Sequence, residues 1–328
     1  MASASFYSQI AANRRNSFLL GIVVVVLLGV LGSAIGYAWS GSSGGAVTVT
    51  VIALIVGALA ALGSYYAGDQ VVLGVSGAKE IGQADAPVLF DVVKELSIAA
   101  GVPMPRVYII DDSAPNAFAT GRDPRHASVA VTSGLLAKLD REELAGVLGH
   151  ELSHVRNYDI RFSLLVGVLV GSIALLADFF LRMTFWGGMG GGRRSDDREG
   201  GGGGGLQALV FVVAIILAIL APIAARLVQL AVSRQREYLA DASSVELTRN
   251  PYGLERALEV IAEDQEPLEV ANRATQHLYF ANPIKKLGGT SVLFSTHPPI
   301  VDRINRLRQL SGERPLSGSE AAPMEGLE

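Results

Sequence analysis

Four long apolar runs dominate the hydrophobic pattern of the chain. Each is close to the roughly 20 residues that a helix needs to cross the hydrocarbon core of a bilayer. We therefore expect about four transmembrane helices in two hairpins. The second run follows the first so soon that the first is expected to be a retained anchor and not a cleaved signal peptide. The runs are Ser17 to Trp39, Ala46 to Gly63, Ile160 to Leu181, and Leu206 to about Ala225.

Between the two hairpins the pattern changes to that of a soluble α+β segment. Apolar residues recur at helical spacing from Ala86 to Ala100, and Gly101 and Pro103 then end the predicted helix. Three short runs rich in aromatic, small or β-branched residues follow, separated by Gly, Pro and Asp, and they predict a small sheet of three strands. These runs are "RVYIID", "NAFATG" and "ASVAVTSG".

The next helix carries the main candidate chemistry. Asp140 can cap its N-terminus, and Glu143 occupies the capping-box position three residues later. If this helix continued unbroken into the third apolar run, His154 would lie on the order of 12 Å from that run. The helix shows one buried stripe, formed by Leu144, Val147, Leu148, Leu152 and Val155.

The pattern predicts the fold class and divides the chain into five parts. The predicted fold class is a mainly α membrane protein with a cytoplasmic α+β catalytic domain that contains a small β-sheet. Further helices are expected from Arg226 to about Arg249, from Leu254 to Glu263 and from Ile300 to Leu310. The parts are the N-terminal hairpin 1–68, a catalytic part 69–159, a second hairpin 160–225 with the Gly-rich linker 186–205, a second catalytic part 226–310, and a disordered tail 311–328.

Charge and composition narrow the function further. Half of the residues are apolar and only 18% are charged, with a net charge of −4 and no basic block that would indicate nucleic-acid binding. Cysteine is absent, which excludes disulfides and thiolate catalysis. Arg14 and Arg15 precede the first apolar run, whereas the turn after it is uncharged, so the N-terminus and both catalytic parts are expected in the cytoplasm.

The sequence "HELSH" contains a metal-binding pattern. His150 and His154 are four residues apart, so on a helix they project from one face and can hold one Zn²⁺ ion. Glu151 lies beside them, where it can take a proton from the attacking water and pass it to the leaving amine. Two surface histidines on an amphipathic helix are the structural alternative, which the capping box and the buried stripe make less favourable.

A catalytic zinc site needs a third protein ligand. No histidine follows His154 until His277, so a carboxylate from a later helix is the remaining common solution. Glu237 in "REYLADASS" can be that ligand. Asp241, four residues later on the same helical face, can accept the outer N–H of a ligand histidine and fix its tautomer.

Four ordered motifs give a more specific indication. "PNAFATG", "GVLGHELSHVRNYD", "REYLADASS" and "FSTHPPIVDRINRL" occur in this order, with a pair of apolar runs between the second and the third. Over most of its length the chain thus resembles the HtpX-type membrane zinc metallopeptidases, which are relatives of the CAAX prenyl proteases. The resemblance implies a zincin-like catalytic domain with zinc ligands at His150, His154 and Glu237 and with Glu151 as general base.

The resemblance also implies roles for residues outside this set. Asn116 and Ala117 would lie in the sheet beside the cleft and pair with an extended substrate, which agrees with the physics of β-strand addition. His297 and Arg303 match the C-terminal motif, where Arg303 would contact the substrate and His297 could stabilise the oxyanion. A structural histidine in the "HPP" turn is an equal alternative for His297.

The function expected from the resemblance is zinc-dependent cleavage of membrane or membrane-associated proteins at the cytoplasmic surface of the cell membrane, in protein quality control. The expected partners are membrane-protein or unfolded polypeptides and the lipid bilayer, and the oligomeric state is left open. Two alternatives are a membrane chaperone or scaffold that retains the metal site, and an intramembrane protease of the site-2 type. The charges around the motif, such as Arg141 and Asp159, argue against an intramembrane site.

Overall fold

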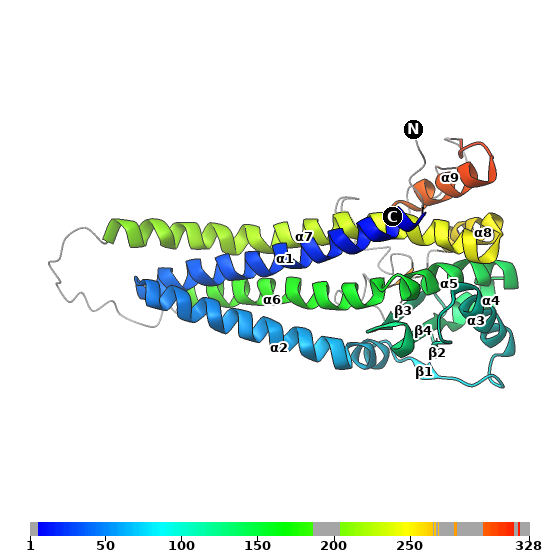
Figure 1. Ribbon diagram of the computed structural model, residues 1–328, viewed down its shortest axis with the longest axis horizontal. Coiled ribbons are helices and arrows are strands. Elements are labelled where there is room, and N and C mark those ends of the chain that lie inside the picture. Colours follow the sequence, from blue (N-terminus) through cyan, green and yellow to red (C-terminus); the bar gives the residue numbers. More distant parts are fainter. Residues whose placement is uncertain are drawn as a thin grey trace. The chain divides into compact units, whose positions relative to one another are not determined.

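The computed structural model describes residues 6–185, 204–264, 266, 268, 279–280, 298–317 and 321 (Figure 1). Two compact units emerge, which we call the sheet unit and the helical unit. The sheet unit comprises residues up to Asn13, Tyr65–Leu164 and the described residues from Leu230 onward, and the helical unit comprises Arg14–Ser64 and the described residues of Leu165–Gln229. The predicted Gly-rich linker lies largely outside the described residues.

Four helices in the described part of the chain are long and apolar enough to cross a membrane, which confirms the predicted number. They are α1 (Phe6–Ser40), α2 (Ser43–Val75), α6 (Asp159–Phe185) and α7 (Gly204–Thr248), each continuous over its whole length. Large apolar side chains on their surfaces are exposed, as expected of residues that face lipid. Trp39 of α1 packs against Phe180 of α6 with ring centroids 5.6 Å apart inside the helical unit.

The sheet has four strands among the described residues, in the order β1-β2-β4-β3. The central strands β2 (Arg106–Ile110) and β4 (Ala127–Thr132) are parallel, and β1 (Lys79–Glu80) and β3 (Ala117–Gly121) add antiparallel at the two edges. The prediction of three strands was therefore wrong by one, because a two-residue strand is too short to show a sequence alternation. Within the described residues β3 is an edge strand, with the side of its backbone away from β4 outside the sheet.

Strand β4 ends earlier than the run "ASVAVTSG" predicted. The side chain of Thr132 accepts a hydrogen bond from the N–H of Leu135 and so caps a short helix, α4 (Ser133–Lys138). A 3-10 turn, η1 (Pro124–His126), connects β3 to β4 and is capped by Asp123. The last two residues of the predicted strand are therefore the first turn of a helix.

Helices α3 (Pro87–Ala100) and α5 (Arg141–Arg156) cover one face of the sheet and form the main core with it (Figure 1). Helix α3 begins and ends close to the predicted bounds, and α5 begins directly after Asp140, as its capping pattern predicted. In α5 the capping box is complete, because Asp140 accepts from the backbone of Glu143 while the Glu143 side chain accepts from the N–H of Asp140. Helices α8 (Pro251–Glu263) and α9 (Ile300–Ser311) complete this core.

The helix that carries "HELSH" does not continue into the third apolar run. Helix α5 ends at Arg156, Asn157 is its C-cap, and Tyr158 has a φ of 62°, in the left-handed region. Helix α6 then begins anew at Asp159. A left-handed residue interrupts the helical hydrogen bonds, so the distance of 12 Å that assumed an unbroken helix does not apply.

Candidate metal centre

Three potential metal ligands come together between α5 and α7. His150 and His154 lie one turn apart on α5, and Glu237 reaches them from α7. The two Nε2 atoms are 3.1 Å apart, and each lies 3.5 Å from an oxygen of Glu237. His150 and Glu237 are buried, and the side chain of His154 is 14% exposed. The ligand triplet predicted from the sequence is thus one spatial cluster.

The dimensions of this cluster suit a small divalent cation. Zinc bonds to imidazole nitrogen or carboxylate oxygen are about 2.0–2.1 Å long, and tetrahedral angles place two such donors about 3.3–3.4 Å apart. The three donor separations bracket this value. Two imidazoles and one carboxylate are also the donor set of known catalytic zinc sites, which keep their fourth position open.

A buried carboxylate fixes the orientation of His150. Its Nδ1 lies 2.8 Å from Oδ1 of Asp241, which leaves Nε2 directed at the cluster. Arg303 donates to the same carboxylate through Nε at 3.0 Å and Nη2 at 2.7 Å. Burial alone would raise the pKa of Asp241, but the charge of Arg303 and the hydrogen bond from His150 lower it below its usual value.

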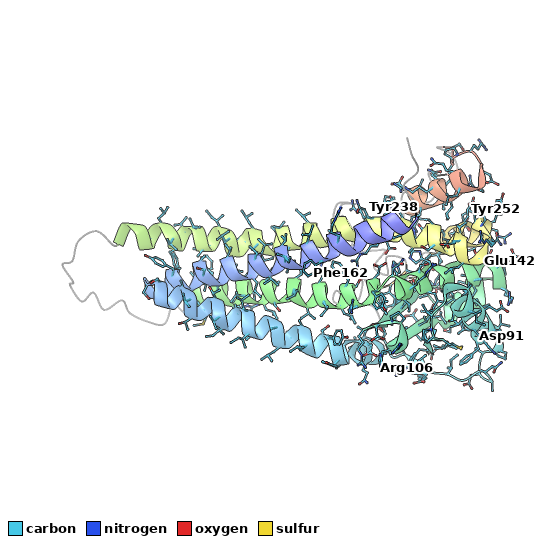
Figure 2. All side chains as sticks on the ribbon, viewed as in Figure 1. Asp91, Arg106, Glu142, Phe162, Tyr238 and Tyr252 are labelled. Carbon is cyan, nitrogen blue, oxygen red and sulfur yellow. The ribbon has the colours of Figure 1, made fainter. Side chains whose placement is uncertain are left out.

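His154 has a carboxylate partner of its own. Its Nδ1 lies 3.1 Å from Oδ2 of Asp159, the first residue of α6. The Nε atom of Arg236 lies 3.4 Å from the other oxygen of Asp159, and its guanidinium stacks 3.5 Å from the ring of Phe162, which Figure 2 labels on α6. Sequence patterns alone did not predict that Asp159 contacts a ligand histidine. The only indication in the sequence that Asp159 has a role was that an acidic residue stands at the start of an apolar run.

Glu151 lies next to the three potential ligands and faces β3. It is almost fully buried, and the backbone N–H of Ala119 in β3 donates a hydrogen bond to its carboxylate. Burial raises the pKa of Glu151 above its usual value, although the two histidines act in the opposite direction. A carboxylate with a raised pKa beside a metal site is suited to accept and return a proton near neutral pH.

The pKa of His154 is also raised, but its partners raise it and burial opposes them. Burial alone would lower its pKa, but hydrogen bonds to Asp159 and Glu237 and the charges of these groups raise it well above the usual value. In the metal-free site these partners favour the protonated form of His154. A metal ion must displace this proton before it can bind, so metal binding and proton release are coupled.

The remaining predicted residues occupy different places. Asn116 is buried beside β3, and its side-chain oxygen accepts from the N–H of Ala117. The carbonyl of Ala117 accepts from the N–H of Phe280 at 2.7 Å. Arg303 is 1% exposed, and its guanidinium is occupied by Asp241 and the carbonyl of Phe280. His297 lies outside the described residues.

Phe280 is a contact residue that the sequence analysis did not find. Its ring packs edge-on against His150, with centroids 4.9 Å apart, and lies 4.6 Å from the guanidinium carbon of Arg303. Its backbone N–H donates a hydrogen bond to the carbonyl of Ala117 in β3. An isolated "YF" pair without a helical or strand pattern gave no signal of this role.

Comparisons with known proteins agree with this geometry. The model of peptidase family M48 matches residues 83–311. A protease HtpX homolog of Streptococcus gordonii is 47% identical over 304 residues, and one of Listeria monocytogenes serotype 4b is 48% identical over 308 residues. Each alignment covers 93% of this chain and 99% of the relative.

Among solved structures, that of S. mikatae Ste24p matches with a TM-score of 0.48 and 19% identity, covering 78% of this chain and 57% of that chain. The family model covers well over half of the sequence, and relatives that are nearly half identical align with almost all of it. The chain therefore belongs to peptidase family M48, among its HtpX-type membrane proteases.

Proposed function

We propose that this membrane protease is a zinc endopeptidase that cleaves membrane or membrane-associated polypeptides on the cytoplasmic side of the cell membrane, in the removal of damaged or misfolded proteins. The observation that carries the proposal is the triangle of His150, His154 and Glu237, with sides of 3.1–3.5 Å and Glu151 beside it. These three residues would hold one zinc ion per chain.

A zinc ion bound there would polarise the scissile carbonyl and lower the pKa of a water molecule at its open position. Glu151 accepts the proton from the attacking water and donates it to the leaving amine. The hydrogen bond from Ala119 holds the Glu151 carboxylate between β3 and the ligand histidines. Asp241 and Arg303 keep the Nε2 of His150 directed at the metal, so we assign Arg303 a positioning role through Asp241.

The side of β3 that faces away from β4 is the proposed substrate-binding edge, which includes Asn116 and Ala117. The backbone N–H and C=O groups of successive residues point to alternate sides of a strand, so those of Ala117 and Ala119 point away from β4. The hydrogen bond from Phe280 to Ala117 supports the proposal, because it is a strand-like bond on this side. An extended substrate would add along the same edge toward Ala119, which brings its backbone close to Glu151.

His297 enters the proposal as a group that could stabilise the oxyanion, with a structural role in the "HPP" turn as the alternative. An oxyanion role predicts that His297→Ala lowers kcat, with zinc content and KM near the wild-type values. A purely structural role predicts a lower melting temperature and a loss of zinc together. Steady-state kinetics and metal analysis of one purified variant separate the two.

The main test compares Glu151→Gln with wild type and with Glu95→Gln. Glu95 lies on α3 and pairs with Arg141 on the surface, so Glu95→Gln makes the same chemical change outside the site. Glu151→Gln should bind zinc stoichiometrically and leave casein and a membrane-protein substrate intact, while Glu95→Gln cleaves as wild type does. Cleavage by Glu151→Gln would remove Glu151 as the base.

A chaperone or scaffold with a retained metal site is the second candidate, and it makes a different prediction. Purified wild-type protein would then bind zinc and unfolded polypeptides but produce no new peptide termini. Zinc loading followed by chelation distinguishes the two, because peptidase activity should disappear with a chelator and return when zinc is added. Mass spectrometry of the digest detects the termini directly.

The cytoplasmic orientation is tested separately. The chain has no cysteine, so one introduced cysteine is a unique label. Ser195→Cys, in the predicted linker, should react with an impermeant maleimide added outside intact cells. Ala99→Cys, on the exposed face of α3, should react only after the membrane is opened. The reverse pattern would place the site on the outer side.

A further inference from the structure

The site contains two similar sets of contacts, and the sequence predicted only one contact of the first set, between Asp241 and a ligand histidine. In the first, Arg303 and Asp241 hold His150. In the second, Arg236 lies 3.4 Å from Asp159, and Asp159 lies 3.1 Å from Nδ1 of His154. Each ligand histidine therefore has its outer nitrogen beside a buried carboxylate, and each carboxylate also contacts an arginine.

We propose that Asp159 is a positioning residue for the metal centre and that the left-handed turn at Tyr158 is the structural device that places it there. The inference rests on the proposed zinc site. Asp159 accepts the Nδ1–H of His154, which keeps the Nε2 lone pair available for the metal. Arg236 fixes the carboxylate from behind, next to the ligand Glu237 in α7.

The burial of these groups argues for a specific function. Asp159 is 4% exposed and Arg236 is also 4% exposed, and two buried charges are tolerated only when they are paired with good geometry. Arg236 is further fixed by Phe162, which follows Asp159 by three residues on the first turn of α6. The start of α6 is thereby joined to the turn of α7 that bears the metal ligand.

The backbone supplies the second observation. A tyrosine with φ of 62° costs of order 1–3 kcal/mol relative to an ordinary conformation, and such strain persists where the surroundings over-determine it. Without the reversal at Tyr158, the chain would continue along α5 and Asp159 would point in another direction. The turn instead makes Asp159 the first residue of a new helix, where a carboxylate is also favoured by the helix dipole.

The test measures zinc affinity by competition with a chromophoric chelator, in full-length protein in detergent. Asp159→Ala should weaken zinc binding by about 10–100-fold, the range for loss of a residue that orients a metal ligand. Asp159→Asn should lie between this variant and wild type, because an amide oxygen still accepts from Nδ1 but has no charge. The visible spectrum of the cobalt-substituted protein should shift in Asp159→Ala, since the imidazole is less constrained.

Asp264→Asn is the matched control. Asp264 is a nearly buried carboxylate that pairs with Lys138 away from the metal cluster, and this variant should bind zinc as wild type does. Wild-type affinity and an unchanged cobalt spectrum in Asp159→Ala would overturn the inference and leave the proposed function intact. Failure of the wild-type protein to bind zinc would overturn both.

A second pair of variants tests the turn. Tyr158→Gly and Tyr158→Val both remove the ring that stacks on Arg161, but only glycine adopts a positive φ without strain. Tyr158→Gly should keep zinc affinity within about twofold of wild type, while Tyr158→Val should lose affinity as Asp159→Ala does, because β-branched residues disfavour this conformation. Equal affinities of the two variants would exclude the turn as the positioning device.

Discussion

Helix α5 crosses α8 at Gly146, one turn before the ligand His150, and we predict that an alanine at Gly146 weakens the fold and the metal site together. A Cβ atom there would lie 2.5 Å from the backbone nitrogen and 2.7 Å from the Cα of Leu254 in α8. The carbonyl of Gly146 also accepts from Ser244 in α7, at 2.6 Å. Three helices thus meet around this one residue.

The magnitude follows from the contact distances. Carbon atoms pack at about 3.5–4.0 Å, so α5 and α8 would have to separate by roughly 1 Å. Both close contacts are backbone atoms, which a rotamer change cannot relieve. Overpacking of this kind costs about 1–3 kcal/mol, and the better helix propensity of alanine offsets it by at most about 1 kcal/mol. We expect a net loss of about 1–2 kcal/mol and lower zinc affinity, because His150 moves with α5.

The assay is thermal unfolding in detergent with and without zinc, combined with chelator competition. Gly74→Ala is the control, since Gly74 lies in helix α2 and no atom lies within 4 Å of its would-be Cβ. It should leave stability unchanged or slightly raise it. If Gly146→Ala melted at the same temperature as Gly74→Ala and bound zinc equally well, the close approach of α5 and α8 would not govern the geometry of the site.

Three further predictions concern charge and pH. The folded state raises the pKa of Glu151, so the folded protein keeps a proton on this carboxyl group at pH values where the unfolded chain has released it. Metal-free wild type should therefore lose stability as the pH rises from the pKa of Glu151 in the unfolded chain to its higher pKa in the folded protein. Glu151→Gln should remove the part of the loss that Glu151 contributes and leave the part from His154, whose pKa is also raised, and denaturation at several pH values measures the difference. The raised pKa of His154 predicts that apparent zinc affinity increases with pH until this group is deprotonated, measurable by calorimetry in several buffers. Arg303→Met should leave Asp241 without its buried cation and lower zinc affinity by at least tenfold in chelator competition, whereas Arg306→Met, on the exposed face of α9, should not.

Local chemistry made part of the fold predictable. The capping box at Asp140 and Glu143 is a contact between residues three apart, so the sequence alone locates the start of α5. The same locality places His150 and His154 on one face. Strand β1 and helix α4 escaped prediction, because one has only two residues and the other begins at a threonine that ends a strand as readily as it caps a helix.

Contacts between residues far apart in the sequence limit how much of the site can be predicted from the sequence. Glu237 and Asp241 could be chosen because one helical turn relates them to each other and the metal requires a third ligand. Asp159 was not found, because its role depends on a backbone reversal at Tyr158 that propensities disfavour in a tyrosine. The structure stores this strain between the end of α5 and the start of α6.

The two carboxylate contacts suggest why the ligand histidines sit on a helix that ends where it does. Asp241 and His150 face each other across α7 and α5, but His154 lies in the last turn of α5, where no residue further along the same helix can reach its Nδ1. A new helix that begins three residues later supplies the missing acceptor at its first position. The left-handed conformation of Tyr158 ends α5 and starts α6 at Asp159, so that the Asp159 carboxylate lies beside Nδ1 of His154. Exchange of Asp159 for glutamate, which keeps the charge but moves it by one methylene, should therefore restore only part of the zinc affinity that alanine loses.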